Sequence, residues 1–376
     1  MTDMDKMKIL QINKFYHPVT GGVERVVQQV VEGLSQRMDM TVLVCQKKGK
    51  RTAEKIKGAV IHRASSWGVV FSMPISLDFF RQFLKLKKEK DIIHIHMPFP
   101  LADVAMALFG FKGKVVLWWH SDVIRQKKLM LFYKPFLLKL LKRADLITVA
   151  TEGHITGSDY LPMYREKCAV IPYGVNNKIL QASDRYVPKE SESNVPVRFL
   201  FVGRLAYYKG VDVLINAFAK VARAELVIVG DGPLDAQLKE RAGMLIVNNR
   251  IRFVNNVSDD VLPHYFSGCD VFILPSVAKS EAFGLVQIEA MVFGKPVINT
   301  QLPGGVPYVS VDGLTGFTVP PADVNALAKA MQKLADDETL RKKFGEAAYK
   351  RAREEFSADV MIRKLHDEYE KLMTGK

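Results

Sequence analysis

The chain has 376 residues, of which 48% are hydrophobic and 25% charged, as is typical of a soluble globular protein. This length exceeds what one hydrophobic core usually supports, so we expect two domains. No apolar run reaches the roughly 18 residues that a membrane span needs, and the first eight residues do not resemble a signal peptide. Three widely separated cysteines offer neither a disulfide framework nor a metal site, which predicts a cytoplasmic protein.

The formal net charge of +14 arises entirely in the first half of the chain. Residues 1–180 contain 29 Lys and Arg against 15 Asp and Glu, whereas the remaining residues contain 25 of each kind. A basic half of this kind is typical of proteins that bind nucleic acid, an anionic bilayer surface or a phosphorylated substrate.

In the first half, short β-branched runs alternate with stretches that can hold a helix, such as Gly22–Arg37 and Arg125–Lys142. Near-continuous apolar strands that alternate with helices indicate a buried parallel sheet. The expected strands are Lys8–Asn13, Thr41–Cys45, Asp91–His96, Lys114–Trp119, Leu146–Ala150 and Cys168–Pro172.

The pattern stops at Asn176–Val195, which we interpret as a linker, and then resumes. Beyond Pro321 the chain is expected to be helical to its end. The sequence therefore predicts an α/β protein of two Rossmann-like, doubly wound domains that face a central cleft. The second set of expected strands is Val197–Val202, Glu225–Val229, Arg252–Val254, Val271–Leu274, Pro296–Asn299 and Phe317–Val319.

The segment Ser276–Met291 (SVAKSEAFGLVQIEAM) follows an expected strand, at the edge where α/β sheets bind ligands. Phe283 and Gly284 open a helix whose first N–H groups are free to bind phosphate. A helical rise over eight residues places Glu281 and Glu289 about 12 Å apart, which is too far for an acid/base pair. The spacing suits one carboxylate at each end of a diphosphate, although two solvated helix glutamates are the alternative.

A second motif, Gly203–Gly210 (GRLAYYKG), follows the first strand of the second half. Arg204 and Lys209 flank a glycine-bounded loop, where a guanidinium fork and a point charge can neutralise a diphosphate. Alone, this loop would be interpreted as ordinary surface. Its occurrence in the same domain as the glutamate segment favours a nucleotide-binding role.

Together these motifs resemble the retaining glycosyltransferases of family 4, which have the GT-B fold, and the resemblance covers nearly the whole chain. It is carried by GRLAYYKG, VGDGPLD, VFILPS and the E-x7-E spacing of Glu281 and Glu289, and Pro18–Glu24 resembles the family's N-terminal glycine loop. The resemblance implies three parts: an acceptor-binding domain at 1–180, a nucleotide-sugar-binding domain at 181–356, and a C-terminal helix at 357–376 that packs on the first domain.

The resemblance also implies roles for individual residues. Arg204 and Lys209 would stabilise the diphosphate leaving group, Glu281 would hold the transferred sugar and Glu289 the ribose. His120, which ends the strand Lys114–Trp119, matches the family's histidine near the reacting centre, although a histidine at a strand end is often structural. The implied catalytic residues are His120, Arg204, Lys209 and Glu281. The implied donor-binding residues are Gly21, Gly22, Gly203, Arg204, Lys209, Glu281, Ala282, Phe283, Gly284, Leu285 and Glu289.

The family arrangement suggests that the acceptor attacks the face from which the diphosphate departs, with no evident enzymic nucleophile. Catalysis would then come from electrostatic stabilisation and positioning. No Asp-x-Asp motif follows a strand, so we expect a metal-independent reaction without a cofactor apart from the donor substrate.

Two basic stretches indicate a partner. Arg125–Arg143 contains seven basic and no acidic residues among leucines and aromatics, and Arg81–Lys90 is also basic. Such stretches suit a peripheral contact with an anionic leaflet, although a solvated helix with a core face is the alternative. We expect a lipid-diphosphate-linked saccharide acceptor and a position on the cytoplasmic face of the inner membrane.

The segment SEAFGLVQIEAM resembles mannosyl- and rhamnosyltransferases of bacterial lipopolysaccharide O-antigen and polysaccharide assembly, which favours GDP-mannose as donor. GDP-rhamnose and UDP-hexoses stay open, because Asn255 and Asn256 stand where the family often has glycine in the loop that meets the base.

The sequence disfavours three other functions. A dinucleotide oxidoreductase is disfavoured because Asp235 replaces the third glycine in the run Gly230–Asp235. A nucleic-acid-binding module is disfavoured by the neutral second half, so no nucleic acid is expected. A nucleotide-sugar 2-epimerase shares the two-domain fold but lacks this E-x7-E context.

Overall fold

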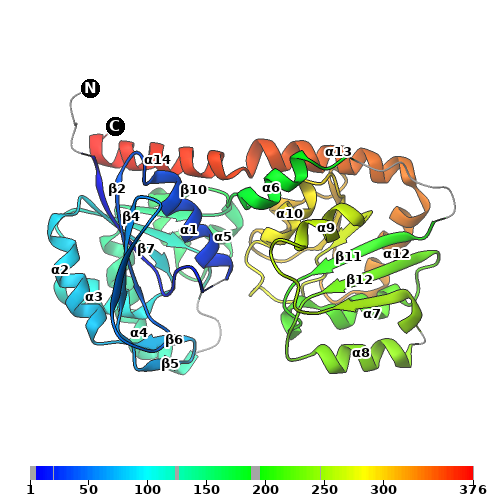
Figure 1. Ribbon diagram of the computed structural model, residues 1–376, viewed down its shortest axis with the longest axis horizontal. Helices are drawn as coiled ribbons and strands as arrows, with labels where there is room; N and C mark the ends of the chain where they lie inside the picture. Colours follow the sequence, from blue (N-terminus) through cyan, green and yellow to red (C-terminus); the bar gives the residue numbers. More distant parts are fainter. Residues whose placement is uncertain (1–5, 20, 123–126, 188–194, 246, 376) are drawn as a thin grey trace. The chain divides into compact units, whose positions relative to one another are not determined.

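The chain forms two compact units in the computed structural model, which describes residues 6–19, 21–122, 127–187, 195–245 and 247–375 (Figure 1). Unit 1 comprises Met1–Gly174 together with Ala358–Lys376, and unit 2 comprises Val175–Ser357. Each unit has its own buried apolar core around one sheet. The expected α/β architecture with two sheets is therefore confirmed.

Unit 1 contains an eight-stranded sheet in the order β10-β9-β8-β7-β1-β2-β4-β3. Every pair is parallel except β3 with β4, which form an antiparallel edge. Six of these strands lie where the apolar runs predicted them. The strands are β1 (Lys8–Ile12), β2 (Asp39–Cys45), β3 (Thr52–Ile56), β4 (Ala59–Ala64), β7 (Ile92–Met97), β8 (Lys114–Trp119), β9 (Leu146–Val149) and β10 (Cys168–Val170).

Four strands of unit 1 were not predicted, and their sequences explain why. β3 has the sequence TAEKI and is exposed at the sheet edge, so it lacks the apolar signal of a buried strand. β4 alternates buried and half-buried residues over its first half. The other two, β5 (Gly68–Val70) and β6 (Met73–Ile75), form a separate two-stranded hairpin.

The helices of unit 1 include one from the end of the chain, as expected. α14 packs on α1, and Gly33 makes room for it, because a Cβ atom there would lie 2.7 Å from Cδ1 of Ile362. The helices are α1 (Gly22–Leu34), α2 (Asp78–Leu86), α3 (Pro100–Phe109), α4 (Lys127–Arg143), α5 (Glu152–Thr156) and α14 (Ala358–Thr374), with 3₁₀ turns at Lys87–Glu89 and Leu161–Lys167.

Unit 2 contains a six-stranded parallel sheet in the order β13-β12-β11-β14-β15-β16. All six strands had been expected, and their order is that of a doubly wound fold in which the direction of winding reverses between β11 and β14. The strands are β11 (Val197–Val202), β12 (Ala224–Val229), β13 (Ile251–Val254), β14 (Val271–Ile273), β15 (Val297–Thr300) and β16 (Gly316–Val319).

The interpretation of Asn176–Val195 as a linker was wrong in its first part. Asn177–Asp184 forms helix α6, because the side chain of Asn176 accepts a hydrogen bond from the Lys178 N–H and so caps the first turn. Residues 188–194 lie outside the described part of the chain. The other helices of unit 2 are α7 (Val211–Phe218), α8 (Asp235–Met244), α9 (Leu262–Gly268), α10 (Leu285–Met291), α11 (Val306–Val309), α12 (Val324–Asp336) and α13 (Glu338–Glu355), with 3₁₀ turns at Tyr207–Lys209 and Asn248–Arg250.

Leu365→Ala tests how much α14 contributes to the stability of unit 1. Leu365 is fully buried, so truncation should lower the free energy of unfolding by about 2–5 kcal/mol. Urea titration followed by tryptophan fluorescence suits this measurement, because Trp67, Trp118 and Trp119 all lie in unit 1. The exposed Lys364→Ala is the matched control. Equal midpoints for both variants would show that α14 is not part of the cooperative unit.

Candidate functional site

The reversal of winding in unit 2 brings two loops together at the carboxyl edge of its sheet. The loop after β11 runs from Gly203 to Gly210, and a backbone hydrogen bond of 2.8 Å joins Val277 N–H of the loop after β14 to Tyr208 C=O. Gly210 has φ +64°, and a Cβ atom there would lie 2.1 Å from the Pro275 carbonyl oxygen. Only glycine permits this approach, and it sets the position of the residue before it, Lys209.

Lys209 and Glu281 form an ion pair where these loops meet. The distance from Lys209 Nζ to Glu281 Oε2 is 2.5 Å, and the two side chains are 11% and 10% exposed. Ser276 Oγ donates to the same carboxylate oxygen at 3.2 Å, and Thr300 Oγ1 donates to the Ser276 carbonyl at 2.6 Å. The two residues that the motifs predicted separately are thus one buried, hydrogen-bonded group.

Arg204 differs from Lys209 in its surroundings, although both were predicted to bind phosphate. Its side chain is exposed and pairs with no acidic group among the described residues. Gly203, directly before it, has φ +158° and lies close to the Lys209 side chain. The loop after β11 therefore presents one neutralised and one uncompensated cation.

The glutamate segment is only partly helical, so the helical rise does not apply to all of the residues between Glu281 and Glu289. α10 begins at Leu285, after Gly284 in the left-handed conformation (φ +75°). Glu281 consequently lies in the preceding loop, where the helical rise does not apply. Glu289 lies within α10 and is buried. Ala282 is fixed by its carbonyl, which accepts from the Gly305 N–H at 2.7 Å.

A buried amide pair, absent from the sequence predictions, anchors this segment to the sheet. Asn299 Nδ2 donates to Gln287 Oε1 at 2.9 Å, and Gln287 Nε2 donates to the Phe283 carbonyl at 3.3 Å. Thr318 Oγ1 donates to Asn299 Oδ1 at 2.7 Å. The available signal was one asparagine inside the apolar strand Val297–Thr300, since a buried amide needs partners.

In unit 1, His120 directly follows β8, as predicted, and both of its ring nitrogens have protein partners. Nδ1 lies 2.6 Å from the Tyr173 hydroxyl, and Nε2 lies 2.9 Å from His96 Nδ1. Burial lowers the pKa of His120 well below its ordinary value, and the neighbouring His96 adds to this effect. His120 is therefore neutral and held on both sides, which favours a positioning role over proton abstraction.

The hydrogen bonds beyond His120 run in one direction. Gln11 Oε1 can only accept, so His96 donates from Nε2 at 2.9 Å, and its Nδ1 must accept from His120. Gln11 Nε2 donates to the Tyr369 hydroxyl at 3.0 Å, and that hydroxyl contacts His94 Nδ1. This series of hydrogen bonds fixes the tautomer of His120, because Gln11 sets the direction of the His96 bonds. Gln11 in turn contacts Tyr369 of α14, which lies 358 positions away in sequence.

Gly21 and Gly22 lie at the start of α1, as predicted. A Cβ atom on Gly21 would lie 2.3 Å from Glu24 Oε2, so any side chain there would displace that carboxylate. Thr20, within the expected glycine loop, lies outside the described residues.

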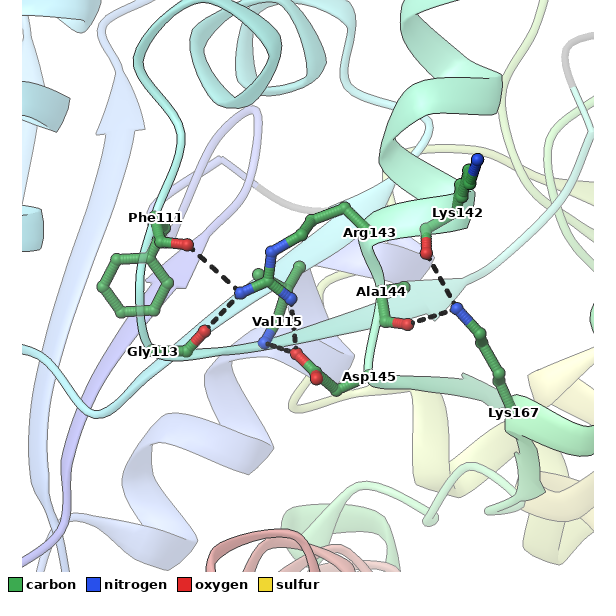
Figure 2. Close-up of polar contacts among 8 residues, drawn as sticks. All are labelled: Phe111, Gly113, Val115, Lys142, Arg143, Ala144, Asp145 and Lys167. Atoms are coloured by element: carbon green, nitrogen blue, oxygen red, sulfur yellow. Dashed lines mark hydrogen bonds and ion pairs between the residues drawn. The ribbon is translucent and has the colours of Figure 1, made fainter.

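The basic stretch at 125–143 serves in part as internal structure (Figure 2). Arg143 pairs with Asp145 at 2.7 Å, and Lys167 Nζ donates at 2.8 Å to the carbonyls of Lys142 and Ala144. Cations at the last carbonyls of a helix complete its hydrogen bonding and oppose its dipole. These contacts hold the end of α4.

The other basic residues of the stretch differ in their surroundings, and the side chains of Lys134 and Lys142 are exposed. Lys139 Nζ donates to the Ala107 carbonyl at 2.9 Å, whereas residues 123–126 and the side chains of residues 127–132 lie outside the described part. Within the described residues, no helix is both long and apolar enough to cross a membrane. The same residues contain no cluster of three metal-binding side chains.

Lys209→Met tests the buried ion pair. Removing the ammonium leaves Glu281 buried with only the Ser276 hydroxyl, so stability should fall by about 3 kcal/mol. Adding Glu281→Gln should restore part of this loss. Far-UV circular dichroism, which reports the backbone of both units, is the readout because unit 2 has no tryptophan. The exposed pair Lys342–Glu338 is the control, and Lys342→Met should cost less than about 1 kcal/mol. Equal effects of the two lysine variants would contradict a special role for the buried pair.

The buried histidines predict a loss of stability in mild acid. Burial lowers the pKa of His94 to about 3, whereas the unfolded value is 6.5. The unfolded chain therefore binds the proton first, so stability is complete above pH 6.5 and falls below it, by about 1.4 kcal/mol per pH unit for each such histidine. His94→Gln should reduce this slope by one proton in denaturant titrations between about pH 7 and pH 5. Unchanged slopes would contradict the assignment.

Comparison with protein families matches both halves of the chain. Residues 20–178 match the model "Glycosyltransferase Family 4" and residues 183–351 the model "Glycosyl transferases group 1". O-antigen chain mannosyltransferase C of Escherichia coli is 31% identical over 98% of this chain and 100% of its own length. D-rhamnosyltransferase WbpZ of Pseudomonas aeruginosa is 33% identical over 94% and 93%, respectively.

Solved structures show the same fold at lower identity. Sucrose-phosphate synthase from Thermosynechococcus elongatus superposes with a TM-score of 0.75 at 21% identity, covering 99% of this chain and 100% of that one. Anabaena Alr3699/HepE in complex with UDP gives 0.77 at 19% identity, covering 97% and 100%. With its two matched family models and full-length relatives, the chain belongs to the family 4 glycosyltransferases and has the GT-B fold.

Proposed function

We propose that this glycosyltransferase moves mannose from GDP-mannose, with retention of configuration, onto a lipid-diphosphate-linked saccharide during bacterial O-antigen assembly. The names of its two full-length relatives at 31% and 33% identity, an O-antigen mannosyltransferase and a D-rhamnosyltransferase, support this substrate class. The lipid carrier and the GDP base are inferences from the sequence resemblance and are tested below.

The observation that carries the proposal is the grouping of Lys209, Glu281 and Arg204 at the winding reversal of unit 2. An incoming diphosphate competes with Glu281 for Lys209, which then neutralises the phosphate while the released carboxylate accepts hydrogen bonds from sugar hydroxyls. Arg204 supplies the second cation as a planar fork. Both members of the buried pair therefore keep a partner in the complex: Lys209 has the phosphate, and Glu281 has hydroxyl donors.

In the proposed reaction, the bond between the sugar anomeric carbon and the diphosphate oxygen breaks as an acceptor hydroxyl attacks the same face. The acceptor proton passes to the departing phosphate, whose growing charge is stabilised by Lys209 and Arg204. We assign to these two side chains the charge stabilisation that a divalent metal supplies in other enzymes. His120 is assigned to positioning near the sugar, and Glu289 to the ribose.

GDP-rhamnose is the second candidate donor. The relative with the higher identity of the two is the D-rhamnosyltransferase, and mannose and rhamnose differ at the C6 hydroxyl. A site that hydrogen-bonds that hydroxyl would discriminate strongly against its absence, so a direct comparison of the two donors decides between them.

A thermal-shift panel of GDP-mannose, GDP-rhamnose, UDP-glucose, ADP-glucose and TDP-glucose tests the donor. GDP-mannose should raise the melting temperature most, because binding to the native state alone stabilises it. Glu281→Ala and Lys209→Ala should lower turnover roughly 100-fold, and Lys342→Ala should leave it unchanged. Activity should also persist in EDTA.

The outcomes separate the parts of the proposal. A larger shift with a UDP sugar would replace GDP as the base, and loss of activity in EDTA would overturn metal independence. Full turnover in Glu281→Ala would refute the site assignment, even if GDP-mannose bound.

A further inference from the structure

The β5–β6 hairpin of unit 1 exposes an unusual amount of apolar surface. We call residues 67–77 the apolar hairpin; none of them is charged. Trp67 is 67% exposed, Phe71 71% and Leu77 63%. Val69, Val70 and Ile75 are exposed as well. In Figure 1 the hairpin lies at the periphery of unit 1. Clustered exposed apolar side chains of this kind mark an interaction site.

The tip of the apolar hairpin holds an aromatic ring outward at a conformational cost. Phe71 and Ser72 have φ of 49° and 64°, the left-handed values that the tightest hairpin turns require. Glycine and asparagine usually occupy these positions, and a bulky residue there is an outlier. With most of its surface exposed, the Phe71 ring does little packing that would offset this cost. The sequence thus retains a large apolar group at the most prominent position of the hairpin.

The base of the apolar hairpin is firmly held, so the tip is presented in a defined way. Ser66 exchanges two backbone hydrogen bonds with Gly49, at 2.9 and 3.0 Å. Ser76 Oγ donates to the Ser65 carbonyl at 2.5 Å, and the Ser65 N–H donates to Asp78 at the start of α2. The exposed side chains are therefore carried on an ordered support.

A cluster of cations adjoins this base. Lys47, Lys48 and Lys50 are exposed on either side of Gly49, and the Gly49–Ser66 bridge ties them to the start of the apolar hairpin. Arg51 follows, with a side chain that stays 55% exposed while lying 3.5 Å from Asp78. Apolar and aromatic groups flanked by lysines match the layered chemistry of an anionic bilayer surface, where phosphates lie above the acyl chains.

We propose that the apolar hairpin inserts Trp67 and Phe71 into the head-group region of an anionic bilayer, with Lys47, Lys48 and Lys50 on the lipid phosphates. The lysines favour a lipid surface over an apolar protein groove, because the negative potential of an anionic bilayer attracts each of them. The inference rests on the proposed function in one respect: membrane attachment would bring the enzyme to its lipid-linked acceptor. It adds an attachment point to the basic stretch at 125–143, for which the sequence predicts contact with the same kind of surface.

Tryptophan fluorescence provides a direct readout. Trp118 and Trp119 are buried, so Trp67 is the tryptophan open to solvent among the three in the chain. On vesicles of phosphatidylglycerol and phosphatidylcholine, the emission should shift to shorter wavelength and become protected from iodide. Lipids brominated near the head group should quench it. Vesicles of phosphatidylcholine alone should give a much weaker effect.

Two sets of variants separate the contributions in vesicle co-sedimentation. Trp67→Ser/Phe71→Ser should weaken binding roughly tenfold or more, whereas Leu108→Ser/Met163→Ser, which removes two exposed apolar side chains elsewhere in unit 1, should not. Lys47→Gln/Lys48→Gln/Lys50→Gln should weaken binding about tenfold and reduce its salt dependence. The exposed lysines of α13 provide the matched triple, Lys342→Gln/Lys343→Gln/Lys350→Gln.

Failure of this inference is distinguishable from failure of the proposed function. Wild-type binding retained in Trp67→Ser/Phe71→Ser, or no vesicle binding at all, overturns the inference and leaves the donor thermal shifts intact. If the wild-type protein self-associates but does not bind vesicles, and the same variant abolishes the self-association, the hairpin forms a protein contact. That result also overturns the inference. Vesicle binding without any nucleotide-sugar shift would uphold the apolar hairpin and refute the proposed donor. Hairpin variants should keep their donor shifts.

Discussion

The reversal of strand order next to the first strand of each sheet is the constraint on which the rest of this structure depends. Where the strand order reverses, the connecting helices on the two sides of that point lie on opposite faces of the sheet. The loops after the two neighbouring strands then lie side by side at its carboxyl edge. In unit 2 this brings the loops after β11 and β14 together, with Gly210 allowing the close approach. In unit 1, His120 follows β8, one strand beyond the corresponding reversal between β1 and β7.

A second feature of the molecule is that buried charged and polar side chains pair with one another. Lys209 and Glu281 neutralise each other in a buried position, and the hydrogen bonds that link His120, His96 and Gln11 run in a single direction. In the proposed reaction, substrate groups would take the place of some of these protein partners. A ligand that binds to Lys209 or Glu281 would have to replace the partner that it displaces, which favours ligands that carry charge and hydroxyl groups of their own. Some basic residues of the first half are paired internally as well: Lys139 and Lys167 donate to carbonyls near the ends of helices.

Most of the fold could be predicted from sequence, because buried parallel strands are near-continuous apolar runs, as in Val197–Val202. The polar edge strand β3 carries no such signal. For the site, sequence identified Lys209 and Glu281 but not their contact, which depends on strands 70 residues apart lying side by side. The start of α10 near Gly284 was expected, but the spacing of the two glutamates was estimated as if Glu281 also lay in the helix. The partner network of His120 was hidden, since its members come from four separate segments.

Tyr369 lies near the end of the chain, yet it belongs to the network that begins beside the first strand. During synthesis, domains generally fold as they leave the ribosome, but unit 1 lacks a helix until the last residues have been added. Unit 2 ends at Ser357, directly before α14. Unit 1 begins first but is the later of the two to be complete in sequence, and the part of α1 that packs on α14 stays uncovered until α14 has been added. Loss of Tyr369 by proteolysis would therefore disturb Gln11, which lies near the opposite end of the polypeptide.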